Sequence, residues 1–341
     1  MQISAMIENQ YRLATHAAGL YARTDRGLLE ITGSDRVAWL NNLVTNVVKT
    51  LQPGDGNYAF APNNKGRVVF DMNILVLPER LWLDLDRRWL DTARRHFAKF
   101  TIIENVNVSD LSAGFDRLAV VGPATADVIG RLGFGNLVPM AQLQHVGITW
   151  DGHEGRLFRH DFVGLEGAEI LIPPAAAGSL QSALLDAGRP TGLTRIDSDT
   201  VETLRIEAGI PASFTDIDDD VVPPETLQVE RAISYHKGCY LGQEVIERMR
   251  SHGVLARRLV GVRLTSAPPT DPPMKLHVGG AEAGRLTSVC WSYALQAPLA
   301  LGYLKSAHAR PGQPVTVVAA ASEIVGEVVT LPVRPLKTPS A

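Results

Sequence analysis

One stretch decides how the fold of this chain is interpreted: Lys237-Gly238-Cys239-Tyr240-Leu241-Gly242-Gln243-Glu244. It combines a base, a thiol, two glycines and an acid, and it leads into an apparent helix over residues 243–250. The two glycines allow tight backbone turns. A helix N-terminus and the neighbouring Lys237 both stabilise negative charge, so they favour a thiolate at Cys239. The alternative is a buried cysteine that packs as a small hydrophobic residue.

Downstream of this stretch the pattern predicts a small β-barrel. Beyond Arg257 the chain shows short runs of β-branched and aliphatic residues, separated by Gly/Pro turns, without a strong helical pattern. The predicted strands cover residues 259–264, 284–289, 299–304, 315–319 and 323–331.

Upstream of the stretch, helical and strand patterns are mixed, which predicts an α+β region. Helices are expected over residues 33–43, 89–100, 123–133 and 174–187 and from residue 198. Strands are expected over residues 57–61, 66–77, 81–86, 102–108, 116–121, 147–150, 155–159 and 169–172. Residues 212–225, rich in Asp and Pro, are expected to form an ordered excursion or a mobile loop, not a regular element.

Composition excludes several classes of protein. Among 341 residues, 45% are hydrophobic and 20% charged, and 33 Lys+Arg stand against 36 Asp+Glu for a net charge of −3. That balance indicates a folded protein without the broad basic surface of a nucleic-acid binder. We find no secretory leader and no apolar run long enough for a membrane span, so a soluble, cytoplasmic protein is expected. The two cysteines lie too far apart for a CxxC pair.

The octapeptide resembles the K-G-C-Y-x-G-Q-E signature of the YgfZ proteins, and the chain resembles the broader glycine-cleavage T-protein (GcvT, aminomethyltransferase-like) superfamily over nearly its whole length. Four further segments carry that wider resemblance: residues 33–36, 51–54, 205–209 and 284–288. The resemblance implies an α+β folate-binding fold with a ferredoxin-like middle subdomain and a C-terminal β-barrel. We expect residues 1–256 to form the folate-binding region and residues 257–341 the barrel. Within the first region, residues 1–110 and 191–256 make the core and residues 115–190 the middle subdomain.

The same resemblance implies site residues for tetrahydrofolate or a one-carbon derivative of it. Glu207 matches the glutamate of an R-x-E-x-G motif that binds the pterin, whose aminopyrimidine edge suits a carboxylate. Asp71 matches by order an aspartate that assists transfer, although T-proteins usually carry paired aspartates and this chain has Phe70 before it. Tyr58 is expected to stack on the pterin, and an ordinary core tyrosine is the alternative. The expected ligand-binding set is completed by Lys237, Gln243 and Arg248.

Three functions remain open at this point. The first, implied by the YgfZ resemblance, is a folate-binding accessory protein that supports assembly or repair of iron–sulfur client enzymes through Cys239. The second is a folate-dependent aminomethyltransferase or demethylase in which Asp71 assists the transfer. The third is a scaffold that binds only proteins. A lone cysteine does not supply the four ligands that a cluster usually takes, so the chain is not expected to hold a cluster by itself. The three histidines His145, His153 and His160 lack metal-site spacing.

Overall fold

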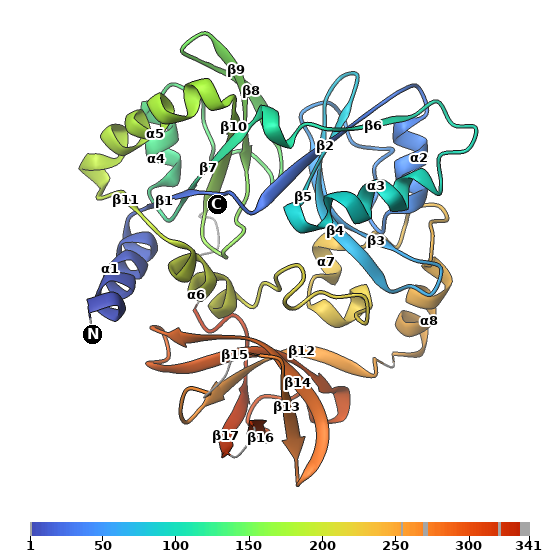
Figure 1. The fold of residues 1–341 in the computed structure, drawn as a ribbon, viewed down its shortest axis with the longest axis vertical. Coiled ribbons are helices and arrows are strands. Elements are labelled where there is room, and N and C mark those ends of the chain that lie inside the picture. The colour runs from blue at the N-terminus through green and yellow to red at the C-terminus, as the bar shows by residue number, and fades with distance from the viewer. Residues whose placement is uncertain (1, 254, 269–271, 320–321, 335–341) are drawn as a thin grey trace.

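The computed structural model describes residues 2–253, 255–268, 272–319 and 322–334. Three lobes surround a central layer of helices and loops (Figure 1). Two lobes are built on open sheets, and the third, at the bottom of the view, is a closed six-stranded barrel. The predicted α+β class and the predicted C-terminal barrel are therefore confirmed. Among the described residues, no helix combines the length and the apolar character needed to cross a bilayer.

The first lobe, at the upper right of Figure 1, holds a five-stranded sheet in the order β3-β4-β5-β2-β6. Its strands are β2 (Arg26–Thr32), β3 (Gly56–Pro62), β4 (Val68–Val76), β5 (Leu81–Asp86) and β6 (Asn107–Asp110), and its helices are α2 (Arg36–Leu43) and α3 (Leu90–Ala98). The sequence of β5 alternates apolar and polar residues, yet all six are buried. Both faces of the sheet are covered, since Leu83 packs in the core cluster that includes α3 whereas Trp82 packs in another.

The second lobe holds a six-stranded sheet in the order β11-β1-β7-β10-β9-β8. Its strands are β1 (Gly19–Ala22), β7 (Asp116–Val121), β8 (His145–Trp150), β9 (His153–Arg159), β10 (Gly167–Ile172) and β11 (Thr194–Arg195), and its helices are α4 (Thr125–Arg131) and α5 (Pro174–Gly188). β1 pairs with β7 on one side and β11 on the other, so segments outside residues 115–190 complete this sheet.

The barrel closes in the order β12-β15-β14-β13-β16-β17. The strands are β12 (Arg257–Leu264), β13 (Met274–Val278), β14 (Ala281–Ser292), β15 (Ala297–Lys305), β16 (Pro314–Ala319) and β17 (Ser322–Val329). Sequence patterning located five of these and missed β13, although its five residues alternate apolar and basic side chains.

The central layer consists of α6 (Ser198–Ala208), α7 (Val229–Ala232), α8 (Gln243–His252) and the segment between α6 and α7, with α1 (Gln2–His16) at its edge. Asp197 caps the N-terminus of α6, because its side chain accepts a hydrogen bond from the Thr200 N–H. Gly209, with φ of +72°, caps the C-terminus. The segment of residues 212–225 is ordered: Asp216 is buried and binds Arg205 of α6 and Ser288 of β14. The expectation of no regular element is wrong at its end, where a 3₁₀ helix, η4 (Pro223–Thr226), begins.

The strand predicted over residues 102–108 is wrong in its first half. The Glu104 carboxylate accepts hydrogen bonds from the N–H groups of Ile102 and Ile103, which holds the chain in a turn. Pairing with β2 begins only at Asn107. Ile102 and Ile103 favour a strand by residue type, but they are 83% and 91% exposed, so no packing stabilises a strand there.

Acidification should weaken the first lobe through His96 of α3. His96 packs against the rings of Phe70 and Phe100, and burial, followed by the charge of Lys99, lowers its pKa to about 4. In the unfolded chain it titrates near its ordinary value of 6.5. The unfolded state therefore binds more protons between these values, and the free energy of unfolding should fall by about 1.4 kcal/mol per pH unit as pH drops through that window.

The substitution His96→Phe keeps a ring in this position and should remove that slope. Urea unfolding at pH about 7 and about 5.5 measures it, with His16→Asn, at an exposed position of α1, as the matched control. Equal pH dependence in the wild type and His96→Phe would contradict the account. The pKa of His145 is also lowered to about 4, by burial and then by Arg156. His145 therefore contributes to the pH dependence that His96→Phe retains.

Candidate functional site

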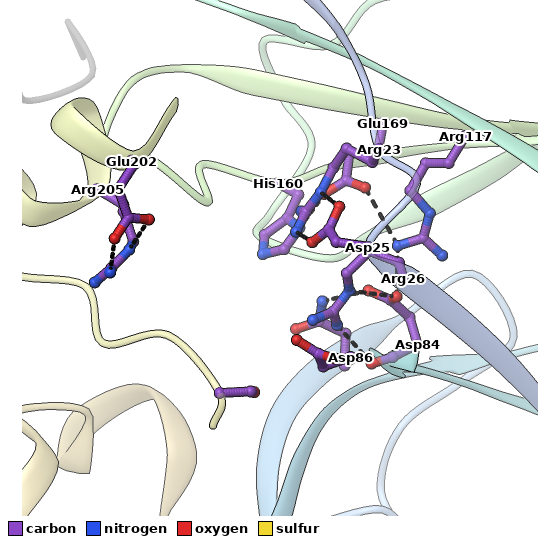
Figure 2. Close-up of polar contacts among 12 residues, drawn as sticks. Arg23, Asp25, Arg26, Asp84, Asp86, Arg117, His160, Glu169, Glu202 and Arg205 are labelled. Carbon is purple, nitrogen blue, oxygen red and sulfur yellow. Dashed lines mark hydrogen bonds and ion pairs between the residues drawn. The ribbon is translucent and has the colours of Figure 1, made fainter. Parts of the chain in front are cut away.

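The two sheet lobes meet at a buried network of charged side chains (Figure 2). Its centre is Asp84 of β5, whose fully buried carboxylate accepts hydrogen bonds from Arg117, Arg26 and Asn73. Burial raises the pKa of the Asp84 carboxyl, but the charges of Arg117 and Arg26 outweigh this and hold it far below its usual range. The ionised carboxylate ties β5 of one lobe to β7 of the other.

Glu169 of β10 forms the other end of the network. It accepts hydrogen bonds from Arg23 at 2.9 Å and Arg117 at 3.3 Å, and His160 Nδ1 lies 2.6 Å from its Oε1. A cavity of about 410 Å³ opens beside these groups, lined in part by Arg23, Arg26 and Arg117. Each of these arginines already pairs with a carboxylate, so the network serves to brace the two lobes.

Asp71 of β4 lies outside this charged network. It lies on the face of its sheet that is covered by the segment between α6 and α7. Its Oδ2 accepts a hydrogen bond from the Tyr58 hydroxyl at 2.9 Å, and its Oδ1 accepts one from the Ser213 hydroxyl. Asp71 and Tyr58 are each 7% exposed. Burial, and then the Asp71 charge, raises the pKa of Tyr58 well above its ordinary value, so the phenol remains a donor.

Neighbouring aromatic contacts fix the segment that carries Ser213. The Phe214 ring stacks on Trp89 with centroids 3.8 Å apart, and the Arg88 guanidinium lies 4.5 Å from the Phe214 centroid. Arg88 also donates to the Ser213 carbonyl at 3.1 Å. Phe214 has φ of +65°, a conformation that costs energy for a residue other than glycine. These contacts hold Ser213 on Asp71.

Glu207 of α6 is fully buried, and hydrogen bonds occupy both of its oxygens. Oε1 accepts from the Ser292 hydroxyl at 2.7 Å and the Ala294 N–H at 3.1 Å. Oε2 accepts from the Tyr11 hydroxyl at 2.7 Å and Arg334 Nε at 2.8 Å. A carboxylate offers about four lone-pair positions, so these four donors use its capacity. Burial, and then the bond to Glu207, raises the pKa of Tyr11 far above its usual value.

Cys239 is exposed and lines a surface pocket of about 440 Å³ with Asn42 and Lys49 among its neighbours. Lys237, which is expected in the ligand-binding set, uses its ammonium for contacts within the chain. Its Nζ donates to the carbonyls of Asn41 at 2.6 Å and of Val44 and Asn46 at 2.7 Å, which closes the C-terminal end of α2. Burial, and then Lys49, lowers the Lys237 pKa to about 7.

Gln243 is also engaged within the chain, because its Oε1 accepts from the Tyr240 N–H at 3.3 Å. Gly242, just before it, has φ of +76°, and a Cβ there would lie 2.3 Å from the Asn63 carbonyl oxygen, so only glycine fits. Arg248 is exposed on α8.

The predicted site residues therefore fall into three groups. Tyr58 and Asp71 are hydrogen-bonded to each other, Glu207 lies in a separate cluster, and Cys239 with Lys237 and Gln243 lies beside the end of α2. Residues 207–213 connect the second group to the first.

Two polar partners escaped sequence analysis: Ser213, which binds Asp71, and Arg334, which binds Glu207. Neither belongs to a motif that the sequence marks. Cys290 of β14 is partly buried, and burial raises its pKa far above the usual value. Within the described ranges, no group of three or more His, Cys, Asp or Glu is arranged to hold a metal.

Comparison with known proteins gives a consistent result over both parts of the chain. Residues 1–237 match the model of the GCVT N-terminal domain, and residues 257–333 match that of the glycine cleavage T-protein C-terminal barrel domain. An aminomethyltransferase of Symbiobacterium thermophilum is 29% identical over 97% of this chain and 90% of its own length. A putative chloroplastic transferase of Arabidopsis thaliana is 27% identical, over 89% and 68%. The crystal structure of glycine cleavage system aminomethyltransferase T from Bartonella henselae shares the fold, with a TM-score of 0.86, 20% identity, and coverage of 97% and 90%.

Proposed function

Because this chain belongs to the glycine cleavage T-protein family, with matches to both its N-terminal domain and its C-terminal barrel domain, we propose that it binds tetrahydrofolate and transfers a one-carbon unit. The relatives named aminomethyltransferase support this over the other functions considered. The substrate would carry the one-carbon unit on a nitrogen. The carbon of an aminomethyl group would bond to tetrahydrofolate nitrogens as ammonia and the carrier leave, which gives methylene-tetrahydrofolate. An N-methyl group would instead give methyl-tetrahydrofolate and the demethylated amine, so neither transfer needs an oxidant.

The observation that carries the proposal is the carboxylate of Asp71 between two hydroxyl donors. Tyr58 and Ser213 each occupy one of its oxygens, which fixes its orientation and leaves further lone pairs for a ligand. A positioned carboxylate can hold or accept a proton as nitrogen–carbon bonds form and break. Tetrahydrofolate would supply the nitrogens that receive the one-carbon unit. Tyr58 and Ser213 would orient the carboxylate.

The second feature that fits a pterin is the chemistry at Glu207. A pterin presents an N–H and an amino group on one edge, and in this respect it resembles a guanidinium. Glu207 already pairs with the guanidinium of Arg334 in a buried site. This pairing with a flat, nitrogen-rich donor supports pterin recognition by Glu207.

The direct test is formation of methylene-tetrahydrofolate by the purified protein. Tetrahydrofolate and an aminomethylated carrier are mixed with the protein, and the product is followed through a coupled dehydrogenase. The proposal expects turnover that depends on both substrates and on the protein. Tetrahydrofolate binding without turnover over the same period would assign the chain to the accessory function instead.

An accessory role in iron–sulfur enzyme assembly or repair is the second candidate, and the exposure of Cys239 favours it. The thiol stands at the surface in a pocket that Asn42 and Lys49 also line, within the stretch that resembles the YgfZ signature. An exposed thiol is accessible to a client or assembly protein or to an oxidant. In this function the chain would still bind folate, and Asp71 would position the ligand without turnover.

For this second candidate, Cys239→Ser is expected to abolish complementation of a strain that lacks the chromosomal copy, while leaving the fold intact. Cys290→Ser, in β14, is the matched control and should complement fully. Alkylation of the native protein should modify Cys239 at least about tenfold faster than Cys290, because the Cys290 thiol is partly buried and its pKa is raised. Full complementation by Cys239→Ser would remove this candidate.

A further inference from the structure

We propose that residues 331–334 are an internal competitor for the pterin, with Arg334 occupying on Glu207 the position that the pterin edge takes when folate binds. The inference rests on the proposed folate-binding function, and it adds that Arg334 competes with folate for Glu207. Folate would bind at Glu207 only in the fraction of molecules in which Arg334 has moved away.

The contacts of Arg334 are specific. Its Nε donates to Glu207 Oε2 at 2.8 Å, and its Nη2 donates to the carbonyls of Leu204 at 3.1 Å and Val163 at 3.3 Å. Its side chain is 11% exposed, and that of Glu207 is fully buried. One guanidinium thus joins α6, the loop after β9 and the chain beyond the barrel.

The backbone next to Arg334 is anchored on α6 as well. The Val333 N–H donates to the Glu207 carbonyl at 2.9 Å. Leu331 packs against the end of α6, where a Cβ on Gly209 would approach its Cβ to 3.0 Å. Residues 331–334 therefore leave β17 and lie along the last turn of α6, although they form neither helix nor strand.

Arg334 and a pterin cannot bind the Glu207 carboxylate at the same time, because its lone-pair positions are already occupied. Glu207 already accepts from Tyr11, Ser292 and Ala294 besides Arg334, so a pterin cannot add a strong bond until one donor leaves. Tyr11 belongs to α1 and Ser292 to β14. The Ala294 N–H is a backbone donor in the turn after β14. Arg334 is the side-chain donor from an irregular segment, and it is also the donor that a pterin edge resembles, so it is the group to be displaced.

The test compares Arg334→Gln with the wild type in calorimetric titrations with tetrahydrofolate. Removing an internal competitor raises the population of the binding-competent state, and the apparent Kd falls in proportion. We expect Arg334→Gln to bind at least about tenfold more tightly. Arg310→Gln, on an exposed turn, is the matched control and should bind like the wild type. Unchanged or weaker binding by Arg334→Gln would overturn the inference while leaving folate binding established.

A second arm uses stability and does not depend on folate affinity. Arg334→Ala should lower Tm, because Glu207 loses its cationic partner in a buried site. Methylguanidinium and free pterin should each restore Tm in Arg334→Ala without raising it in the wild type or in Arg310→Ala. Rescue by methylguanidinium but not by pterin would make Arg334 a structural brace and would overturn the competition. If neither the wild type nor any Arg334 variant binds tetrahydrofolate or pterin, both the inference and the proposed function fail.

If Arg334→Gln and Arg334→Ala do not fold, Arg334→Lys keeps a charge near Glu207 but loses the flat fork of donors. It should bind tetrahydrofolate more tightly than the wild type, by a smaller factor. An affinity equal to or below that of the wild type would again overturn the inference.

Discussion

Replacing Asp84 by alanine is expected to lower the free energy of unfolding by about 3–5 kcal/mol. The change leaves Arg26 without its carboxylate and leaves Arg117 with Glu169 at 3.3 Å as its remaining ion-pair partner. Both arginines are largely buried, with side chains 12% and 4% exposed, so water from the adjoining cavity replaces only part of the lost interaction. Chemical denaturation at pH about 7 measures the loss.

Asp25→Ala is the control for that measurement. Asp25 pairs with Arg23 at 2.8 Å at the edge of the same network, but its side chain is 43% exposed. Arg23 keeps its buried partner Glu169 when this half-exposed carboxylate is removed, so the expected loss is about 1 kcal/mol. If Asp84→Ala and Asp25→Ala destabilise the protein equally, the buried network does not brace the two lobes.

Exchanging Asp71 for asparagine is expected to reduce the rate of one-carbon transfer about 10²–10⁴-fold, the usual contribution of a general acid or base. Asparagine has nearly the same volume and still accepts one hydroxyl hydrogen bond, so the fold should persist. Single-turnover formation of methylene-tetrahydrofolate measures the effect. Asp91→Asn, at an exposed position of α3, should leave the rate unchanged.

The result that contradicts this assignment is an Asp71→Asn rate within about threefold of the wild type. Asp71 would then serve packing alone, as the hydrogen-bonded partner of Tyr58 and Ser213. A loss of Tm by Asp71→Asn as large as that of Asp84→Ala would make the rate measurement a report on unfolding, so both Tm values accompany it.

Strong local patterns predicted much of the fold. β5 and β7 occupy the predicted residues, and α5 ends one residue beyond its prediction. β5 alternates apolar and polar residues, whereas β7 is followed by Gly122-Pro123 and α5 is bounded by Pro174 and Gly188. α1 was not predicted, because its packing is decided by distant residues. Tyr11 and Ala14 of α1 pack in a cluster with Ile196 and Leu204 from the far end of the N-terminal region.

Sequence motifs and order led to the candidate residues Asp71, Tyr58 and Glu207, whereas tertiary contacts bring Ser213 and Arg334 to them. Asp71 and Tyr58 are neighbours on paired strands, so their proximity follows from the hairpin of β3 and β4. Ser213 and Arg334 reach the site from irregular segments with no periodicity, and sequence pattern gives no signal for either. For Lys237 the sequence pattern and the structure differ. Its place beside Cys239 suggested that it stabilises a thiolate, whereas its ammonium donates to carbonyls at the C-terminal end of α2.

The central claim is that this chain binds tetrahydrofolate, and anaerobic calorimetric titration of the purified wild-type protein tests it most directly. The account predicts saturable, one-to-one binding with a Kd within the range of about 1 μM to 1 mM typical of enzyme substrates. It also predicts a Tm that rises with tetrahydrofolate concentration. No saturable heat and no change in Tm at tetrahydrofolate concentrations up to about 1 mM would contradict the claim.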